Sequence, residues 1–437
     1  MTPAATVPMS EDRARDIAAG FDLRALPADF HANPYPVYRA LRQTTPIRRM
    51  PDGCYFLTRY ADLVAVYRDA AIFSSDKRVE FGPKYNIAPY GSDTDPAPLF
   101  QHHTTSLVFN DPPLHSRVRR LIMGALTRRA IADLEPGLVT LVDRLLDSMQ
   151  EHGGGDLVED FASAIPVEII GNLLGVPPAE RGPLRGWSLA ILGALEPALT
   201  AQQHALGNRG VSEFSSYLGG LVAQRRRRPG DPEHDVLTRL IQGEGTTPAG
   251  RLGEAELLQN CVFILNAGHE TTTNLIANAL VALAEWPAAR RKLLARMAPL
   301  AHSSEALQAC LSLAVDELLR FESSNQLGNR RALRACSLDG VDLPAGALLT
   351  LCIGAANRDP AQFERPDVLD LERADNRHLA FGFGIHQCAG LSLARLEGRI
   401  AIGRFLQRFP NYRLSAAPQR AARVRFRGFV QARFAVD

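Results

Sequence analysis

The sequence predicts a mainly α protein with a minor β part. Apolar residues recur at helical spacing over residues 114–297, and a further helical pattern covers about residues 391–409. Between them, residues 333–353 contain short β-rich pieces separated by the turn signals Asp339-Gly340 and Pro344-Ala345-Gly346. Together, these three observations favour helices around a large core with a small amount of sheet.

The first part of the chain is less regular. Residues 34–41 and 60–67 are predicted as short helices, and Pro51-Asp52-Gly53 is typical of a hairpin turn. Residues 78–107 are rich in Gly, Pro, Asn, Asp and His, so we expect a long loop, of the kind that is usually functional or disordered. We expect residues 1–33 to form an N-terminal tail and residues 34–437 to form one domain.

Charge and composition exclude several classes of protein. The 437 residues include 49 Lys+Arg and 47 Asp+Glu, a net charge of +2 that gives no global reason to expect nucleic acid. The basic run 225–228 lies at a predicted helix end, where cations complement the helix dipole. No apolar run approaches the about 18 residues of a membrane span, and the N-terminus lacks a signal-peptide core. We therefore expect a cytoplasmic monomer.

One cysteine stands in an unusual setting. The six cysteines form no Cys-x-x-Cys pair, which argues against a zinc ribbon or a disulfide framework. Cys388, however, lies in the glycine-rich run 381–390 just before a predicted helix, and a helix start favours a thiolate. His386 is too close in sequence to act as a second zinc ligand. The run predicts a metal site with one thiolate, against the alternative of a buried structural cysteine.

The long helical pattern over residues 254–285 contains a second signal. Gly268 lies near its middle, where glycine costs roughly 1 kcal/mol against alanine, so a close ligand beside Ala267 and Gly268 is one explanation. Glu270 and Thr271 follow directly, and an acid beside a hydroxyl can relay protons. The alternative is a core helix packed through small residues.

These two motifs resemble the haem-binding loop and the oxygen-activating helix of the cytochrome P-450 family, and the resemblance runs from about Pro34 to Leu414. It implies haem b between the long central helix and the helix after the cysteine loop, with Cys388 as the axial ligand of the iron and O₂ as co-substrate. It assigns Glu270 and Thr271 to catalysis. Further residues that it places at the haem are Ala267, Gly268, Phe381, Gly382, His386 and Gly390.

The resemblance also implies supporting residues. Glu317 and Arg320 match the family's Glu-x-x-Arg pair, which locks onto a later arginine, here Arg373, and braces the haem loop. Five residues match contacts to the two haem propionates: His115, Arg119, Arg330, His378 and His386. Arg331 is not distinguished from Arg330 by the sequence. Each of these residues, taken alone, is equally an ordinary surface or capping residue.

The substrate pocket is expected to include the 78–107 segment, the 185–215 helical region and Phe429. Individual substrate contacts are expected from Phe263, Asn266, Gln326 and Gly328. Two departures from the family pattern leave the shape of the pocket and the packing near the sulfur open: Ser324 stands where Pro is frequent, and Ala389 stands where Leu is frequent.

The function implied is that of a monooxygenase acting on a small hydrophobic organic substrate. No Rossmann or iron–sulfur signature follows the cysteine loop, so electrons from NAD(P)H are expected to arrive indirectly, through a separate ferredoxin and ferredoxin reductase. Arg117, Arg120 and Arg399 are candidates for a basic docking face. The alternatives are a peroxide-driven or isomerase-like haem-thiolate enzyme, and a non-catalytic haem or small-ligand sensor. Neither alternative requires the pair formed by Glu270 and Thr271.

Overall fold

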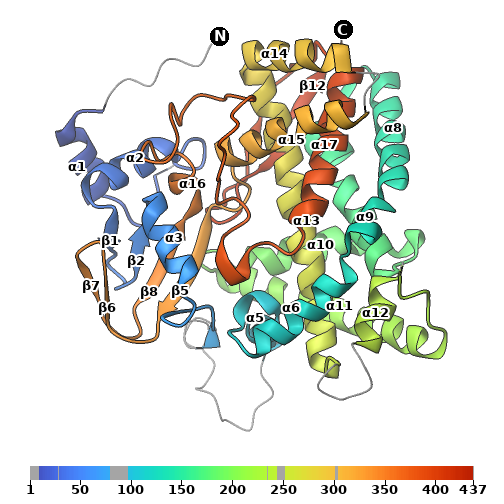
Figure 1. The fold of residues 1–437 in the computed structure, drawn as a ribbon, viewed down its shortest axis with the longest axis horizontal. Helices are drawn as coiled ribbons and strands as arrows, with labels where there is room; N and C mark the ends of the chain where they lie inside the picture. Colours follow the sequence, from blue (N-terminus) through green and yellow to red (C-terminus); the bar gives the residue numbers. More distant parts are fainter. Residues whose placement is uncertain are drawn as a thin grey trace. The chain divides into compact units, whose positions relative to one another are not determined.

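Helices make up most of the chain in the computed structural model, as the sequence predicts (Figure 1). The structure describes residues 9–27, 29–78, 97–233, 235–243, 251–300 and 304–436. The chain divides into two compact units: the first comprises Met1–Ile72, Gly137–Ile165 and Thr271–Asp437, and the second comprises Phe73–Pro136 and Pro166–Glu270. No helix in the described ranges is long and apolar enough to cross a membrane.

The first unit contains a sheet built from both ends of the chain. Its strands run in the order β1 (Ile47–Arg49), β2 (Tyr55–Leu57), β8 (Leu348–Cys352) and β5 (Leu327–Ala332), and Figure 1 shows the early and late strands side by side. β2 and β8 are parallel, whereas the other neighbours are antiparallel. Both parallel strands are almost wholly buried, which explains their continuous apolar sequence.

The remaining strands of the first unit are short. β6 and β7 form the hairpin predicted at Asp339-Gly340, β10 pairs with β11, and β12 lies between β4 and β9. Their bounds are β4 (Gly154–Asp156), β6 (Cys336–Leu338), β7 (Val341–Leu343), β9 (Arg413–Leu414), β10 (Gln419–Arg420), β11 (Phe429–Gln431) and β12 (Arg433–Ala435).

The helices of the first unit include two that carry motifs. α15 (Ser304–Phe321) bears the Glu-x-x-Arg pair, and α17 (Leu391–Arg408) follows the cysteine loop. α17 packs closely on its neighbours at Gly398. A Cβ added there would lie only 3.2 Å from Leu275 and 3.3 Å from Val315. The others are α1 (Glu11–Ala19), α2 (Tyr35–Thr44), α3 (Tyr60–Arg68), most of α8 (Glu135–Glu151), a π-helical turn η2 (Leu157–Ala162), α14 (Pro287–Met297), η5 (Ala298–Leu300), α16 (Ile353–Ala356) and η6 (Gly384–His386).

The expected tail at residues 1–33 differs from the structure. α1 starts at the N-cap Ser10, and Ala14 and Ala18 are buried. Phe21 and Phe30 join Tyr38 and Phe56 in an apolar cluster of the first unit. The sequence signal was weak because half of the apolar residues in this segment are alanines, which are interspersed with charged residues and prolines, so tertiary packing outweighs the local pattern.

The second unit is almost entirely helical. Its elements are β3 (Phe73–Ser74), α5 (Pro98–Thr105), η1 (Leu107–Phe109), α6 (Leu114–Ala125), α7 (Arg128–Ala132), most of α9 (Ala164–Leu174), η3 (Pro178–Glu180), α10 (Gly182–Gly193), α11 (Ala201–Arg227), α12 (Val236–Gln242) and the first half of α13. α13 (Glu254–Glu285) has the predicted bounds and continues into the first unit. The basic run does end a helix, where Arg225 pairs with Asp235 at 2.6 Å.

The predicted loop over residues 78–107 is wrong in its last part. Residues 98–105 form α5, which starts with Pro98 and buries Leu99, His102 and His103 on one face. A single turn with two histidines among its buried residues does not resemble an apolar helical stripe, so the sequence pattern missed it. Residues 79–96 of the predicted loop lie outside the described part of the chain.

Candidate active site

The cysteine loop folds back on itself before α17. The N–H of Cys388 donates to the carbonyl of Phe381 at 2.9 Å, and Gln387 N–H donates to Gly384 O at 3.0 Å. Gly382 and Gly384 have φ values of +65° and +71°, which side chains other than glycine rarely adopt. Gly390 caps α17, so the loop presents the half-buried Cys388 two residues before a helix start.

α3 supports this loop from one side. A Cβ at Gly384 would overlap the carbonyl of Tyr67, the second-to-last residue of α3. The guanidinium of Arg68 lies 5.3 Å from the centroid of the Phe383 ring. Sequence patterns do not predict this contact, because α3 and the loop are more than 300 residues apart. Only glycine at 384 lets the loop approach α3 so closely.

Two of the other thiols are poor candidates for a metal ligand. Burial raises the pKa values of the Cys261 and Cys352 thiols to about 12, so neither supplies a thiolate near neutral pH. Among the described residues, no group of three or more His, Cys, Asp or Glu side chains is placed to hold a metal ion. Cys388 differs from the other cysteines in lying in a glycine-rich loop just before a helix, which is the feature that the sequence prediction used.

The middle of α13 has an open face. Every residue from Gln259 to Leu283 is buried except Phe263, Ala267, Gly268 and Thr271. Four-residue steps place these side chains on one side of the helix. The side chain of Ala267 is exposed although the residue lies in the centre of a 32-residue helix. The two small residues thus border an opening, and Gly268 also approaches Ile170, because a Cβ there would lie 2.6 Å from its side chain.

The polar residues of this motif differ in exposure. Thr271 belongs to the open face, whereas Glu270 is only 5% exposed. Burial lowers the pKa of His269 to about 3, with a smaller effect from Arg185, so its imidazole is neutral at physiological pH. A buried, neutral His269 is consistent with a packing role.

The Glu-x-x-Arg residues and Arg373 form one buried cluster. Arg320 donates to both oxygens of Glu317, at 2.7 and 2.8 Å, and Arg373 donates to Glu317 at 3.0 Å. Arg320 also donates to the carbonyls of Asn357 and Pro366, both at 2.8 Å. The side chains of Glu317 and Arg320 are 0% exposed. The cluster therefore ties α15 to the segment that leads into the cysteine loop.

The predicted propionate contacts have different surroundings. Arg330 is buried in β5 with its guanidinium 5.0 Å from the Tyr67 ring, whereas the neighbouring Arg331 leaves the opposite face of the strand and is half-buried. His378 has both ring nitrogens engaged, since Nε2 lies 3.4 Å from Asp316 and Nδ1 accepts from Ala380 N–H at 3.2 Å. Its contacts favour the alternative, a structural histidine.

The remaining three candidates lie in the cysteine loop and on α6. His386 is half-buried in η6 within the cysteine loop. His115 and Arg119 lie four residues apart on α6 in the second unit, with His115 buried at 2% exposed and Arg119 half-buried. A spacing of four residues puts both on one helix face, as predicted.

Some of the predicted substrate residues lie at the open face of α13, whereas others have contacts typical of packing. Phe263 belongs to the open face of α13, and Asn266 is buried beside it. Gln326 is 1% exposed, donates to Ser323 O at 2.7 Å and packs against Gly354, so its contacts favour packing. Gly328 packs closely against the Tyr67 hydroxyl, because a Cβ at this position would lie 2.5 Å from it. Ser324, where Pro was expected, accepts a backbone bond from Arg427 at 2.8 Å.

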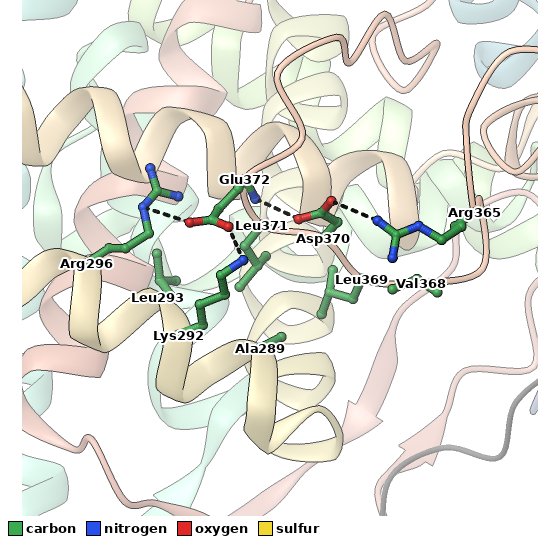
Figure 2. A pocket seen from close by; sticks show the side chains of 10 residues that line it. All are labelled: Ala289, Lys292, Leu293, Arg296, Arg365, Val368, Leu369, Asp370, Leu371 and Glu372. Atoms are coloured by element: carbon green, nitrogen blue, oxygen red, sulfur yellow. Dashed lines mark hydrogen bonds and ion pairs between the residues drawn. The ribbon is translucent and has the colours of Figure 1, made fainter.

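A surface pocket of about 230 Å³ lies elsewhere in the first unit (Figure 2). Figure 2 shows Lys292 and Arg296 of α14 on Glu372, and Arg365 facing Asp370. Its other lining residues are apolar: Ala289, Leu293, Val368, Leu369 and Leu371. The charges are paired with one another and no thiol, hydroxyl or imidazole lines the pocket, so it does not compete with the cysteine loop as a reaction site.

Comparison with known proteins agrees with this geometry. The family model for Cytochrome P450 matches residues 197–427. Vitamin D(3) 25-hydroxylase of Pseudonocardia autotrophica is 36% identical over 390 residues, covering 88% of this chain and 89% of that protein. Cytochrome P450 monooxygenase PikC of Streptomyces venezuelae is 34% identical over 404 residues, covering 91% and 89%.

A solved structure extends the likeness to the fold. P450BioI, crystallised with acyl carrier protein ligated to hexadec-9Z-enoic acid, is 31% identical with a TM-score of 0.83, covering 94% of this chain and 100% of that one. Three findings lead to one conclusion. They are the mainly α architecture, the cysteine in a glycine-rich loop before a helix, and the relatives named as hydroxylases and monooxygenases. The chain belongs to the cytochrome P450 family and is a haem-thiolate monooxygenase.

Proposed function

We propose that this enzyme inserts one atom of O₂ into a small hydrophobic organic substrate, with electrons delivered by a separate ferredoxin and ferredoxin reductase. Cys388 would hold the iron of haem b through its thiolate. The observation that carries the proposal is the half-buried cysteine held by glycines just before α17. The positive end of the helix stabilises a thiolate there.

The residues present fit a haem. The single thiolate of Cys388 would supply the protein's bond to the iron. A planar dianion needs cations when it is buried, and the first unit contains the buried Arg330 on β5 and His386 in the cysteine loop. His115 and Arg119 offer a second pair on α6. His378 remains in the proposal with less support, because its ring is already held by Asp316 and Ala380.

When bound, haem supplies the activation of O₂ and the oxidation of the substrate. The chain supplies the surroundings: Ala267 and Gly268 keep one face of α13 free of bulk. Thr271, on that face, orients reactants through its hydroxyl, and the adjacent Glu270 moves protons from solvent. Glu317, Arg320 and Arg373 hold the cysteine loop in place without taking part in chemistry.

The substrate class and the electron donor are inferred from two kinds of support. The relatives' names refer to polyketide biosynthesis, biotin biosynthesis and vitamin D(3), and these names support an organic small molecule as the substrate. For the donor, the basic residues offer modest support. Arg117 is paired with Glu256, and Arg399 donates to Ser312 at 3.2 Å. Both arginines thus have contacts within the chain in addition to any contact with a redox partner.

The first experiment tests the axial ligand. Reduced protein under CO is expected to show the red-shifted Soret band of a thiolate-ligated haem. Cys388→His should retain haem but move the band to the position of an imidazole complex, and Cys388→Ala should abolish the thiolate band. Cys336→Ala, which removes another half-buried thiol of the first unit, is the matched control. A thiolate band that survives in Cys388→Ala contradicts the assignment.

The second experiment separates the monooxygenase from its alternatives. Product formed from a spin-shifting ligand is measured with NADPH, ferredoxin and reductase, and separately with hydrogen peroxide alone. Turnover only with the reductase chain supports the proposal. Turnover on peroxide alone indicates the peroxide-driven enzyme, and ligand binding without turnover under either condition indicates a sensor.

A further inference from the structure

A chain of neutral polar groups surrounds His102 in the second unit. His102 lies on α5 and is 3% exposed. Its Nδ1 is 3.1 Å from Gln259 Oε1 and 3.1 Å from Ser106 Oγ, and its Nε2 is 3.3 Å from Asn266 Nδ2. Gln259 and Asn266 both belong to α13. The imidazole therefore joins α5 to the helix that carries the open face.

These contacts fix the tautomer of His102. Ser106 Oγ has one hydrogen, which goes to a backbone carbonyl, either His102 O at 2.6 Å or Gln259 O at 3.3 Å. Towards the ring, Ser106 Oγ is therefore an acceptor, and so is Gln259 Oε1. Nδ1 must carry the proton. Burial also lowers the pKa of His102 to about 4, so the ring is neutral and Nε2 is a bare acceptor.

The tautomer in turn fixes the orientation of Asn266. A bare Nε2 can only accept, so the Asn266 amide must present its Nδ2 hydrogens to it. The amide oxygen, Oδ1, then points away from His102 and has no hydrogen-bond partner among the described residues, although Asn266 is only 3% exposed. A buried acceptor without a donor is unfavourable, and such groups are rare unless a ligand or water completes them.

Asn266 also stands next to the opening along α13. It directly precedes the exposed Ala267 and lies three residues after the partly exposed Phe263. The residues that precede it on the helix are closed and apolar, since Cys261, Val262 and Leu265 are 0% exposed. A ligand lying along Phe263 and Ala267 therefore meets the Asn266 acceptor about one helical turn before the Thr271 hydroxyl.

We propose that Asn266 Oδ1 accepts a hydrogen bond from a hydroxyl or amine of the substrate, and that His102 is the positioning residue that aims it. The substrate is then a hydrophobic molecule with one small donor group, since the enclosed Oδ1 leaves no room for a bulky one. This inference rests on the proposed function in treating the ligand as a substrate. It adds the chemical class and a residue outside the family motifs.

The test compares ligands that differ only in the donor. Two pairs serve as probes: testosterone with androstenedione, and 1-dodecanol with dodecyl methyl ether. We expect the wild-type protein to bind at least one alcohol about three- to tenfold more tightly than its partner, the range of one net hydrogen bond. Equilibrium dialysis measures this without using the haem spectrum or turnover, so a failed haem assignment and a failed subsite are told apart.

Three variants at α13 sharpen the comparison. Asn266→Leu should abolish the preference for the alcohol. Asn266→Asp should keep it, because a neutral Asp can donate its proton to His102 Nε2 and retain a carbonyl acceptor. Asn260→Leu is the structural control: Asn260 is fully buried with both amide groups bonded, to Leu107 N and Glu256 O, so its loss should lower stability and leave the preference unchanged. Equal affinities for both members of each pair, failure of both alcohols to bind, or a preference that persists in Asn266→Leu overturns the proposal.

The role of His102 has a readout that needs no ligand. ¹⁵N chemical shifts of the histidine rings in the diamagnetic ferrous–CO protein, or in the apoprotein if haem does not bind, report the tautomer. The signal that disappears in His102→Phe is that of His102, and we expect the Nδ1–H form. His102→Phe should also reduce the preference for the alcohol. An Nε2–H tautomer would turn the amide round, expose Nδ2 as a donor and overturn the proposal.

Discussion

The end of α15 and the middle of α13 both bury polar side chains, but they do so in opposite ways. At the end of α15, Glu317 and Glu322 are ionised partners of arginines, and their oxygens accept several bonds each. In the middle of α13, Asn266 is neutral and has a free acceptor, and the helix face beside it is open. Burial alone therefore does not distinguish a structural group from a functional one.

The difference lies in whether the protein itself completes the hydrogen bonds. Arg427 joins Glu322 to the carbonyls of His31 and Ala32, at 2.7 and 2.9 Å, so this pair ties distant segments of the first unit together. Such a satisfied network is rigid and leaves nothing for a ligand. An incomplete network beside an opening has the reverse properties, which is why we assign binding to α13 and bracing to α15.

The largest expected effect comes from breaking the paired region. Arg320→Ala should destabilise the fold by about 3–5 kcal/mol, because Glu317 would remain buried without its main partner. Urea unfolding and haem retention measure the loss. Arg404→Ala, which breaks the partly exposed pair with Asp143, is the matched control and should cost under about 1 kcal/mol. Similar losses in the two variants would contradict the division between bracing and surface charges.

A second prediction concerns a buried carboxyl that has no charged partner. Glu397 on α17 is 2% exposed, its Oε2 has no hydrogen-bond partner among the described residues, and burial raises its pKa to about 8. Because the folded-state pKa lies above the unfolded value, stability is greatest at low pH and falls as the pH rises towards 8. Between about pH 6 and 8, the loss should reach about 2 kcal/mol.

Glu397→Gln removes this titration. The variant should therefore be more stable than the wild-type protein at about pH 8 and should show a flatter pH dependence above about pH 6, as measured by urea unfolding. Glu305→Gln, at the start of α15, where Glu305 is exposed, is the control. Parallel pH profiles of wild-type and Glu397→Gln proteins would show that an unseen partner stabilises the charge.

The third prediction has the opposite sign and tests the paired region again. Burial alone would raise the pKa of Glu322, but Arg427, Arg420 and Arg358 lower it to about 2. The folded value lies below the unfolded one, so the stabilisation is present above about pH 4.5 and is lost as the pH falls towards 2. Between about pH 4.5 and 3, we expect a loss of about 2 kcal/mol, measured as the difference in unfolding free energy between wild-type and Glu322→Gln proteins. A difference that does not change over this interval contradicts the ionised pair.

The two regions also differ in how far the sequence predicts them. The bounds of α13, the cysteine loop and the joining of Glu317, Arg320 and Arg373 follow from local patterns and a family motif. The Glu322 cluster does not, because Tyr35, Arg358 and Arg427 reach it from separate parts of the chain. No local period records such a meeting.

The same reason explains what was missed at α13. Asn266 was a candidate from its place beside the motif, but its orientation depends on His102, in a segment expected to be loop. Its hydrogen-bond partner becomes visible only once α5 and α13 are both placed. The sequence thus makes Asn266 a candidate, whereas the residue proposed to orient its amide lies in a distant segment of the chain.

The smallest expected effect concerns the open face itself. Thr271 is partly exposed on that face and the adjacent Thr272 is 3% exposed, so one hydroxyl borders the opening and the other lies in the core. Valine replaces threonine with little change in shape. Thr271→Val should therefore leave haem content and ligand binding unchanged but misdirect protons. We expect product per NADPH to fall about tenfold, the upper range for one hydrogen bond, while peroxide rises.

Thr272→Val is the matched control, because it removes a hydroxyl one residue away from the opening. It should leave product per NADPH near the wild-type ratio and alter only stability. The measurement is product and peroxide formed per NADPH with purified ferredoxin and reductase. If both variants uncouple to the same degree, or neither does, the open face does not mark the residue that controls protons. The contrast between satisfied and incomplete polar groups would then apply to binding at Asn266 and not to catalysis at Thr271.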